Sequence, residues 1–382
     1  MDFKSTYITH TNCITPLGFD VESNLTSIAA GISGIERHED SRLMASSFYA
    51  GAIQDDAIER AFAAISADKN YTRLEKMMIL ALYPVVKDSG VVFTKKTGLL
   101  IATTKGNISA LTGITPPDSA YLAQLAQNVG DFFNFIAQPV VVSNACVSGI
   151  LAVSVAKRLI QSGMYSEVFV VSGDELSEFV LSGFNVFQAM SDAPCRPYSA
   201  NRSGVSLGEA AAAALVTTDA KAAKAKITGD ASVNDANHIS GPSRTGEGLV
   251  RSLVNAMNEA GVGPNEIDYI SAHGTATPFN DEMEAVAFSR TGLTDVPVNS
   301  FKGYYGHTLG ASGLLETVIG IECMLHNKLF KSLGYDSHGV SEPINVISEN
   351  RECTINRFIK TASGFGGCNT AVVFEKIHHG DR

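Results

Sequence analysis

Residues 140–160 read VVVSNACVSGILAVSVAKRLI, and this stretch decides which fold the chain can adopt. Residues 139–143 are typical of a short buried strand, and residues 147–161 are typical of a closely packed helix of small apolar residues. Cys146 therefore lies where a strand turns into a helix. A helix built from Ala, Gly, Ser and Val packs closely on both sides, so we expect it to lie between two sheets.

The second half of the chain repeats this pattern of strand, glycine-rich turn and small-residue helix. There, a strand is predicted at residues 296–300 and a long helix at residues 309–325. Further strands are predicted at residues 6–12, 99–103, 168–172, 210–217, 226–231, 269–272 and 370–374. Further helices are predicted between the cap Asp20 and Gly31, at 74–87 with a kink at Pro84, at 249–260 and at 281–289. We predict an α/β fold with α/β/α/β/α layering and two duplicated halves, residues 1–217 and 218–382.

Composition and charge argue against several functional classes. The 382 residues carry a net charge of -10, whereas a nucleic-acid-binding surface needs a basic face. No uninterrupted apolar run reaches the roughly 18 residues of a membrane span, and no signal region follows the N-terminus. We expect a cytoplasmic protein without a membrane partner. The six cysteines form no CxxC pair, so neither a metal site nor a disulfide framework is expected.

Cys146 is the first candidate for a catalytic residue. Backbone N–H groups and the helix dipole converge at a helix start, which favours a thiolate and supplies an N–H for a developing oxyanion. A thiolate is a natural nucleophile for exchanging acyl groups between thioesters. Taken alone, Cys146 could also be a small apolar core residue, which is the common role of an isolated cysteine.

Two further segments favour the catalytic reading. His273 lies in AHGTATPFND (272–281), and His307 lies in VNSFKGYYGHTLGASG (298–313). Each histidine follows an apolar strand, in a turn rich in Gly and Thr, where side chains project from the end of a sheet. Two such histidines and a cysteine at a helix start form a credible set of nucleophile and acid/base groups.

The chain resembles the β-ketoacyl-acyl-carrier-protein synthases, the elongating Cys-His-His condensing enzymes of the thiolase superfamily. Five segments carry the resemblance, in family order: NACVSG (144–149), RPYSANRSGVSLGEAAAAALV (196–216), HGTATPFND (273–281), KGYYGHTLGASGLLE (302–316) and SGFGGCN (363–369). Each motif is weak alone, but five in order are specific. The resemblance implies a thiolase-like fold and a decarboxylative Claisen condensation in fatty-acid or polyketide biosynthesis.

The resemblance also implies roles for individual residues. Cys146 matches the nucleophile that takes the acyl chain, and the backbone N–H groups of Cys146 and Phe365 match the oxyanion hole. Phe365, between glycines, matches a gate between the acyl pocket and the malonyl site. His273 and His307 match the pair that promotes loss of CO2 from the malonyl unit and stabilises the enolate, a task suited to neutral N–H donors.

Other motif residues match supporting roles. Lys302 and Glu316 match a buried charged pair that either orients the site or is a structural salt bridge. Thr275 and Thr277 match hydroxyls that hold the pantetheine arm. Asp281 is expected to cap the helix that follows it.

The resemblance further implies the partners of the protein. No metal or redox cofactor is expected, because phosphopantetheine arrives on the acyl carrier protein. Family members are dimers, either with themselves or with a related synthase subunit, and the strand before Cys146 pairs across the two-fold axis. A basic docking face for the acidic carrier protein is predicted from Lys69, Arg73 and Lys76, whose spacings of four and three could place them on one helix face.

The chain departs from the family pattern at several positions. Asn144 stands where most members carry Thr, and Ser363 stands where many carry a second Phe. Tyr304 and Tyr305 occupy a turn that is usually smaller or more polar, and residues 106–138 form a shortened segment without Lys or Arg. We predict that the substrates are unusual acyl chains, polyunsaturated or aryl-primed, such as those of aryl polyene pigments.

Related functions remain as alternatives. A thiolase would use a second cysteine as base, and an initiating synthase that accepts acyl-CoA would use Cys, His and Asn. A non-catalytic chain-length factor, the partner subunit of a heterodimeric synthase, typically lacks the nucleophilic cysteine. The surroundings of Cys146 resemble no cysteine protease signature.

Overall fold

The computed structural model describes residues 4–111, 113, 115–235, 237 and 239–377. Within these ranges, ten strands form one sheet in the order β11-β10-β14-β15-β9-β1-β8-β6-β4-β5. The N-terminal part contributes β1 (Thr6–Ile14), β4 (Thr97–Ala102), β5 (Val140–Val142), β6 (Glu167–Asp174) and β8 (Ala210–Thr217). The C-terminal part contributes β9 (Ala225–Asn234), β10 (Tyr269–Ser271), β11 (Val298–Asn299), β14 (Arg357–Gly364) and β15 (Cys368–Lys376).

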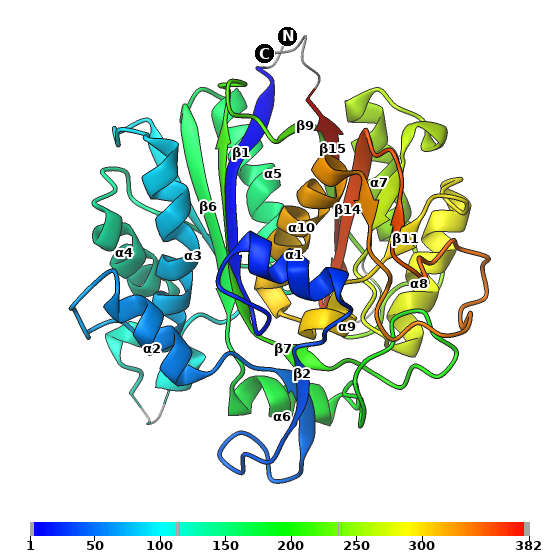
Figure 1. The fold of residues 1–382 in the computed structure, drawn as a ribbon, viewed down its shortest axis with the longest axis horizontal. Helices are drawn as coiled ribbons and strands as arrows, with labels where there is room; N and C mark the ends of the chain where they lie inside the picture. Colours follow the sequence, from blue (N-terminus) through cyan, green and yellow to red (C-terminus); the bar gives the residue numbers. More distant parts are fainter. Residues whose placement is uncertain (1–3, 112, 114, 236, 238, 378–382) are drawn as a thin grey trace.

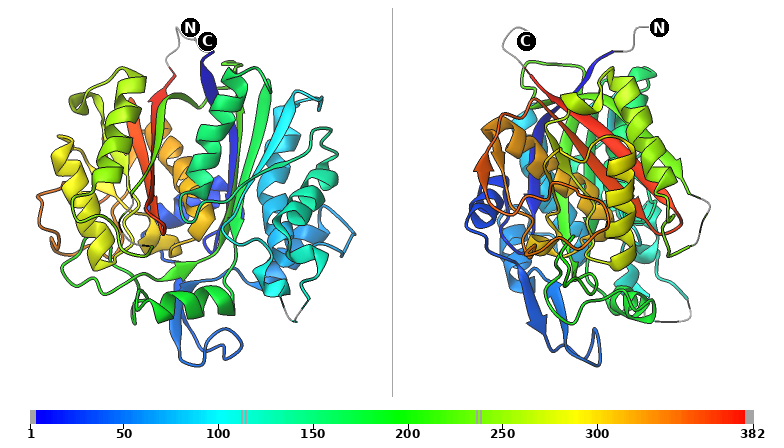
Figure 2. Two further views of the ribbon diagram at one scale, coloured as in Figure 1. Left: turned by 180° about the vertical axis from the view of Figure 1, so that it is seen from behind. Right: turned by 90° about the vertical axis from the view of Figure 1, so that its right-hand side faces the viewer.

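The two halves of this sheet diverge because β1 and β9 pair over only a short length. β1 pairs with β8 along most of its length, but it pairs with β9 only from Thr6 to Ile8. Past Ile8 the halves separate, and the helices α5 (Ser148–Gln161) and α10 (Ser312–His326) lie between them (Figure 1). The outer faces are covered by α2 (Asp55–Ala63), α3 (Arg73–Ser89) and α4 (Leu122–Phe133) on one side, and by α7 (Glu247–Ala260) and α8 (Pro278–Arg290) on the other (Figures 1 and 2). The predicted α/β/α/β/α layering is confirmed, whereas the duplication of the two halves stays a prediction.

Shorter elements lie around this layered body. A small sheet contains β2 (Ile35–His38), β3 (Phe48–Gly51) and β7 (Leu207–Gly208), and a second pairs β12 (Lys328–Leu329) with β13 (Arg351–Glu352). The remaining helices are α1 (Val21–Ala29), α6 (Glu178–Val186) and α9 (Lys302–Tyr305). The sheet of β2, β3 and β7 and the helix α6 lie at one end of the molecule, at the bottom of Figure 1.

Most predicted elements are confirmed to within a few residues, and the differences have local causes. Asp20 caps α1 as expected, since its carboxylate accepts a hydrogen bond from Ser23 N at 2.7 Å. α3 continues through Pro84 and ends at Gly90, whose φ of 63° is the left-handed conformation that glycine favours. β14 was not predicted, because Lys360 and Thr361 interrupt its apolar pattern.

The central helices α5 and α10 touch at the level of their backbones. A Cβ atom on Gly149 would lie 2.6 Å from the carbonyl oxygen of Gly310, and one on Gly313 would lie 2.6 Å from Ile150 N. Only glycine leaves room for this approach. The loops before α5 and α10 are therefore held close together, and these loops carry Cys146 and His307.

The segment Leu309–His326 is long and apolar enough to cross a membrane, judged by length and composition, and it alone among the described residues passes that test. It contains α10, and 89% of it lies buried inside the molecule. The composition of this segment is therefore explained by its place between the two sheets.

We predict that Gly313→Ala destabilises the protein by about 1–3 kcal/mol, because the added methyl group has to displace backbone atoms of α5. The loss is measured by urea unfolding. Gly183→Ala in α6 is the matched control, since no atom lies within 4 Å of its added methyl group. The control is expected to keep its stability or gain up to about 1 kcal/mol. Equal stabilities of the two variants would contradict the close contact.

Candidate active site

Cys146 lies in a tight turn between β5 and α5. The preceding residue, Ala145, has a φ of 45°, which is rare for a residue with a side chain. Ser148 stabilises the turn: its hydroxyl accepts a hydrogen bond from Asn144 N at 2.8 Å and donates one to the Ala145 carbonyl at 2.7 Å. The turn lifts the cysteine off the end of the strand and points it into a cavity.

Burial dominates the chemistry of the Cys146 thiol. It raises the pKa of Cys146 to about 12, against the smaller lowering effects of Lys105 and Lys302. The prediction that the helix start favours a thiolate is therefore wrong, because the pKa of Cys146 is raised and not lowered. Lys105 follows β4 and is half-buried, and its ammonium donates to the Thr104 hydroxyl at 2.9 Å. Its closeness to Cys146 was missed, because it depends on how β4 and α5 pack together.

His273 and His307 lie next to each other beside Cys146. Their ring centroids are 5.1 Å apart and the rings are nearly perpendicular, at 85°. Each residue is only 2% exposed, and neither Nδ1 has a hydrogen-bond partner among the described residues. Burial, followed by the charge of Lys302, holds the pKa of both imidazoles well below the usual value. Both rings are therefore neutral at pH 7 and can donate one N–H each.

Lys302 and Glu316 form the buried ion pair that the sequence predicts. Lys302 Nζ lies 2.8 Å from Glu316 Oε1, and the Ser312 hydroxyl donates to the same oxygen. A second lysine was missed: Lys360 Nζ lies 2.5 Å from Glu316 Oε2. Burial raises the pKa of Glu316, but the two ammonium groups outweigh it, so the net pKa lies below the usual value. The sequence did carry a signal for this residue, because a lysine among the mostly apolar residues 358–362 is expected to have a buried partner.

The main chain at His273 is held by Glu284, a residue of α8. Its two carboxylate oxygens accept hydrogen bonds from His273 N at 2.8 Å and from Gly274 N at 2.6 Å. The Tyr198 hydroxyl donates to the same carboxylate at 3.0 Å. Sequence reasoning did not single out Glu284, which lies just beyond the HGTATPFND motif.

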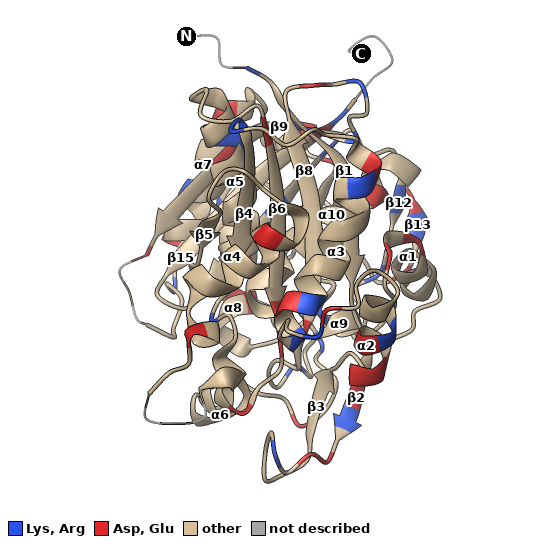
Figure 3. Ribbon diagram, turned by 90° about the vertical axis from the view of Figure 1, so that its left-hand side faces the viewer, with Lys and Arg blue, Asp and Glu red and all other residues tan. Residues whose placement is uncertain are grey.

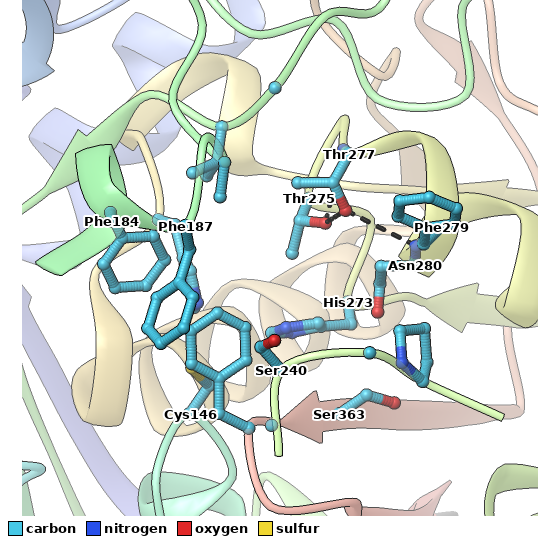
Figure 4. A pocket seen from close by; sticks show the side chains of 18 of the residues that line it. Cys146, Phe184, Phe187, Ser240, His273, Thr275, Thr277, Phe279, Asn280 and Ser363 are labelled. Carbon is cyan, nitrogen blue, oxygen red and sulfur yellow. Dashed lines mark hydrogen bonds between the residues drawn. The ribbon is translucent and has the colours of Figure 1, made fainter. Parts of the chain in front are cut away.

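A cavity of about 340 Å³ joins the three candidate catalytic residues to the surface. Cys146, His273 and His307 line it together, and so do Thr275 and Thr277, whose hydroxyls are 2.8 Å apart. Figure 4 shows the two threonines across the opening from Phe184 and Phe187. The structure thus brings five predicted residues and two phenylalanines that were not predicted around one cavity.

Phe365 also lines the cavity and packs in an aromatic cluster. Its ring stacks on Phe184 with centroids 5.4 Å apart and meets the edge of Phe187 at 5.5 Å. The neighbouring Gly364 lies against the nucleophile turn, where an added Cβ would be 3.1 Å from Cys146 N. The turn at Phe365 and the nucleophile are therefore adjacent, as an oxyanion hole between their N–H groups requires. The hole itself and the gating motion stay predictions.

Two further sequence predictions are wrong. Asp281 does not cap α8, because the helix begins at Pro278 with Thr277 as its cap. Asp281 is instead fully buried in the first turn and accepts hydrogen bonds from Tyr198 N at 2.7 Å and Ala276 N at 3.1 Å. Burial raises the pKa of Asp281 to about 7.

The predicted docking face at the start of α3 is not free. Arg73 bonds to Asp55 at 2.6 Å and to Glu209 at 2.6 Å, and Lys76 bonds to Glu59 at 2.6 Å. Acidic segments of α2 lie beside the basic start of α3 in Figure 3. Of the three, Lys69 alone is exposed, and it forms no ion pair with any residue that the structure describes. The prediction of a docking face is wrong because helical spacing does not show what packs against the helix.

The departures from the family pattern have different surroundings. Tyr304 and Tyr305 are fully buried in the core between the sheets. The Ser363 hydroxyl donates to the Asn369 side chain at 2.8 Å and lines the cavity. α4 lies within residues 106–138, so that segment is partly helical.

Comparison with known proteins identifies the family of this chain. The family model described as "Beta-ketoacyl synthase, N-terminal domain" matches residues 5–222, and "Beta-ketoacyl synthase, C-terminal domain" matches residues 224–336. The chain belongs to the β-ketoacyl synthase family. It is thus a β-ketoacyl-acyl-carrier-protein synthase of the thiolase superfamily, an acyltransferase with the thiolase-like fold.

Named relatives support the same family. The synthase is 25% identical to 3-oxoacyl-[acyl-carrier-protein] synthase 2 of Staphylococcus aureus, over 98% of this chain and 99% of the relative. It is 30% identical to a putative mitochondrial 3-oxoacyl-[acyl-carrier-protein] synthase of Schizosaccharomyces pombe, over 64% of this chain and 63% of the relative.

Two solved structures show the same fold. A β-ketoacyl synthase from Burkholderia phymatum superposes with a TM-score of 0.87 at 24% identity, covering 98% of this chain and 100% of that chain. The ishigamide ketosynthase/chain length factor superposes with a TM-score of 0.89 at 21% identity, covering 99% of this chain and 100% of that chain.

We predict that Lys105→Met slows alkylation of Cys146 by iodoacetamide at pH 8. Lys105 lowers the pKa of the thiol, so removing its charge raises that pKa and moves the alkylation profile to higher pH. The rate is followed by mass spectrometry of the peptide that contains Cys146. Lys96→Met is the control, because Lys96 is exposed and bonds to the Gly163 carbonyl. Superimposable profiles for all three proteins would contradict the role of Lys105.

Proposed function

We propose that this synthase extends a Cys146-bound acyl chain by decarboxylative condensation with a malonyl unit on an acyl carrier protein. The observation that carries the proposal is that Cys146, His273 and His307 line one cavity, with both imidazoles neutral. The proposed steps use only these protein groups. Phosphopantetheine enters on the carrier protein, and Thr275 and Thr277 at the entrance hold its arm.

The first step is acyl transfer. The sulfur of Cys146 attacks the thioester carbonyl of the acyl-carrier protein, a carbon–sulfur bond forms, and the carrier thiol leaves with the proton. Because burial raises the pKa of Cys146 to about 12, the proton has to leave during the attack, and a neutral imidazole nearby can accept it. The N–H groups of Cys146 and Phe365 stabilise the oxyanion.

The second and third steps make the new carbon–carbon bond. Malonyl-carrier protein loses CO2, and the electron pair of the broken bond forms an enolate whose oxygen accepts N–H bonds from His273 and His307. The enolate carbon attacks the acyl-cysteine, and the thiolate of Cys146 leaves and takes up a proton. Neutral donors already in place stabilise this charge where it develops, which is the efficient use of electrostatics in catalysis.

The acyl substrate is proposed to be conjugated or aryl-primed, as in aryl polyene biosynthesis. Phe184, Phe187 and Phe365 form an aromatic cluster at the cavity. Flat conjugated groups stack on such rings with a preference that a flexible saturated chain lacks. Ser363, which stands in place of a second Phe, also lines the cavity.

A dimer is proposed to form through β5. This strand is the last in the sheet order and pairs only with β4, so its other edge is open within the chain. One related ketosynthase structure, from Xenorhabdus doucetiae, is a complex with its chain length factor, at a TM-score of 0.84. The partner here is a second copy or such a subunit. The cytoplasm is the proposed location, in keeping with the carrier protein as partner.

A non-catalytic chain-length factor is the second candidate function. Those subunits also have this fold. The presence of Cys146 beside two neutral histidines favours the catalytic subunit instead.

We expect intact-mass spectrometry to show a gain of one acyl group on the wild type after incubation with acyl-carrier proteins. The gain should be absent in Cys146→Ala. In competition, conjugated donors should be loaded before saturated ones of the same length. His273→Asn and His307→Asn should still be acylated but should lose condensation by about 100-fold or more. No acylation with any donor would overturn the catalytic assignment and favour the chain-length factor.

Native mass spectrometry tests the proposed dimer. Alone, the protein is expected at twice the chain mass of 40.4 kDa, or as a monomer that pairs with a related subunit. In either dimer the amides of β5 should exchange slowly with deuterium, because a paired edge strand is protected. Rapid exchange at β5 within an intact dimer would contradict a dimer interface formed by β5.

A further inference from the structure

No step of the proposed reaction uses Lys360, a buried lysine. It lies in β14, its side chain is fully buried, and its ammonium is surrounded by four acceptors. Nζ lies 3.1 Å from the carbonyl oxygens of both Ser271 and Ala272, 2.7 Å from that of Thr361, and 2.5 Å from Glu316 Oε2. An ammonium has three protons, so no donor of Lys360 is left unused.

The carbonyl of Ala272 belongs to the peptide group that also contains His273 N. Lys360 therefore holds the oxygen of this peptide, and Glu284 accepts the hydrogen bond from its nitrogen at 2.8 Å. A cation and an anion thus clamp the two ends of one peptide. The clamp lies just past the end of β10 at Ser271, next to the last sheet hydrogen bond, which Ala272 N donates to Asn299 O at 2.9 Å.

The charges around His273 come from several elements. Lys302 of α9, Lys360 of β14 and His307 all lower its pKa, after the larger effect of burial. Two carboxylates lie near the same groups. Glu316 on α10 pairs with both lysines, and Glu284 on α8 accepts a hydrogen bond from the main chain of His273. Without Lys360, the Glu316 carboxylate would keep one cation instead of two.

We propose that Lys360 is a positioning residue for His273: it fixes the peptide that carries the imidazole. Its charge also favours the uncharged form of the ring, beside the larger effects of burial, Lys302 and His307. This inference rests on the proposed decarboxylative function. Lys360 touches no substrate, and it acts through the main chain of residues 271–272 and through Glu316.

The test separates the decarboxylation step from the acylation step. Lys360→Met removes the charge and keeps an unbranched chain of similar length. We expect the variant to acylate Cys146 at the wild-type rate but to release CO2 from malonyl-carrier protein on the order of 100-fold more slowly at pH 7. The split between the two steps is the signature, because a general loss of folded protein would slow both.

The pH profile is the second readout. Removing a cation near His273 raises the pKa of the imidazole, so the neutral form is lost at a higher pH as the solution is acidified. The acid limb of the CO2-release profile should therefore move to higher pH in Lys360→Met. Lys360→Arg keeps the charge and N–H donors, so its acid limb should stay at the wild-type position, even if its rate is lower.

Lys157→Met is the matched control, because Lys157 is another buried lysine with carboxylate partners and lies outside the site. Its Nζ bonds to Asp230 at 2.9 Å and Glu259 at 2.6 Å, and it contributes to neither histidine pKa. The Lys157→Met variant should have lower thermal stability than the wild type but the same acid limb.

An acid limb in Lys360→Met equal to that of the wild type would overturn the inference. If Lys360→Met does not fold, an acid limb moved in Lys360→Arg would also overturn it. A wild type that releases no CO2 would instead contradict the proposed function.

Discussion

The backbone contact between α5 and α10 is the constraint on which the rest of this structure depends. Cβ atoms on Gly149 or Gly313 would overlap main-chain atoms of the facing helix. Because the two helices lie so close, they form one layer between the two halves of the sheet. The loops before both helices therefore lie at the same end of the molecule (Figure 1). The nucleophile on one loop and His307 on the other meet there, so close packing at a distance from the chemistry sets the geometry of the site.

Burial between the sheets also decides the charge states in the site. In a dry interior an unpaired charge is costly, which keeps both imidazoles neutral and the thiol of Cys146 protonated. The charges that do occur are matched, with the carboxylate of Glu316 between the ammonium groups of Lys302 and Lys360. A site arranged in this way meets the negative charge of an enolate with donors already in place, without reorganisation of solvent.

Local arguments were reliable where the decisive contacts are local. The capping of α1, the ending of α3 and the position of Cys146 between a strand and a helix depend on residues close together in the chain, and the structure has them as expected. The pKa of Cys146 was expected to fall because of the helix start, but it rises. The helix start is a local feature, whereas the burial that outweighs it comes from the layers above and below.

By itself, the sequence determined the layered α/β class, the family through five ordered motifs, and the reactive trio Cys146, His273 and His307. These follow from periodicity and from turn residues at fixed places in the chain. Tertiary structure alone decided that Lys360 and Glu284 clamp one peptide at His273, and that Arg73 is bonded to carboxylates of its own chain. The reason is physical: the partner of a side chain lies opposite it in space, and residues as far apart as these meet only after the sheets and helices have packed.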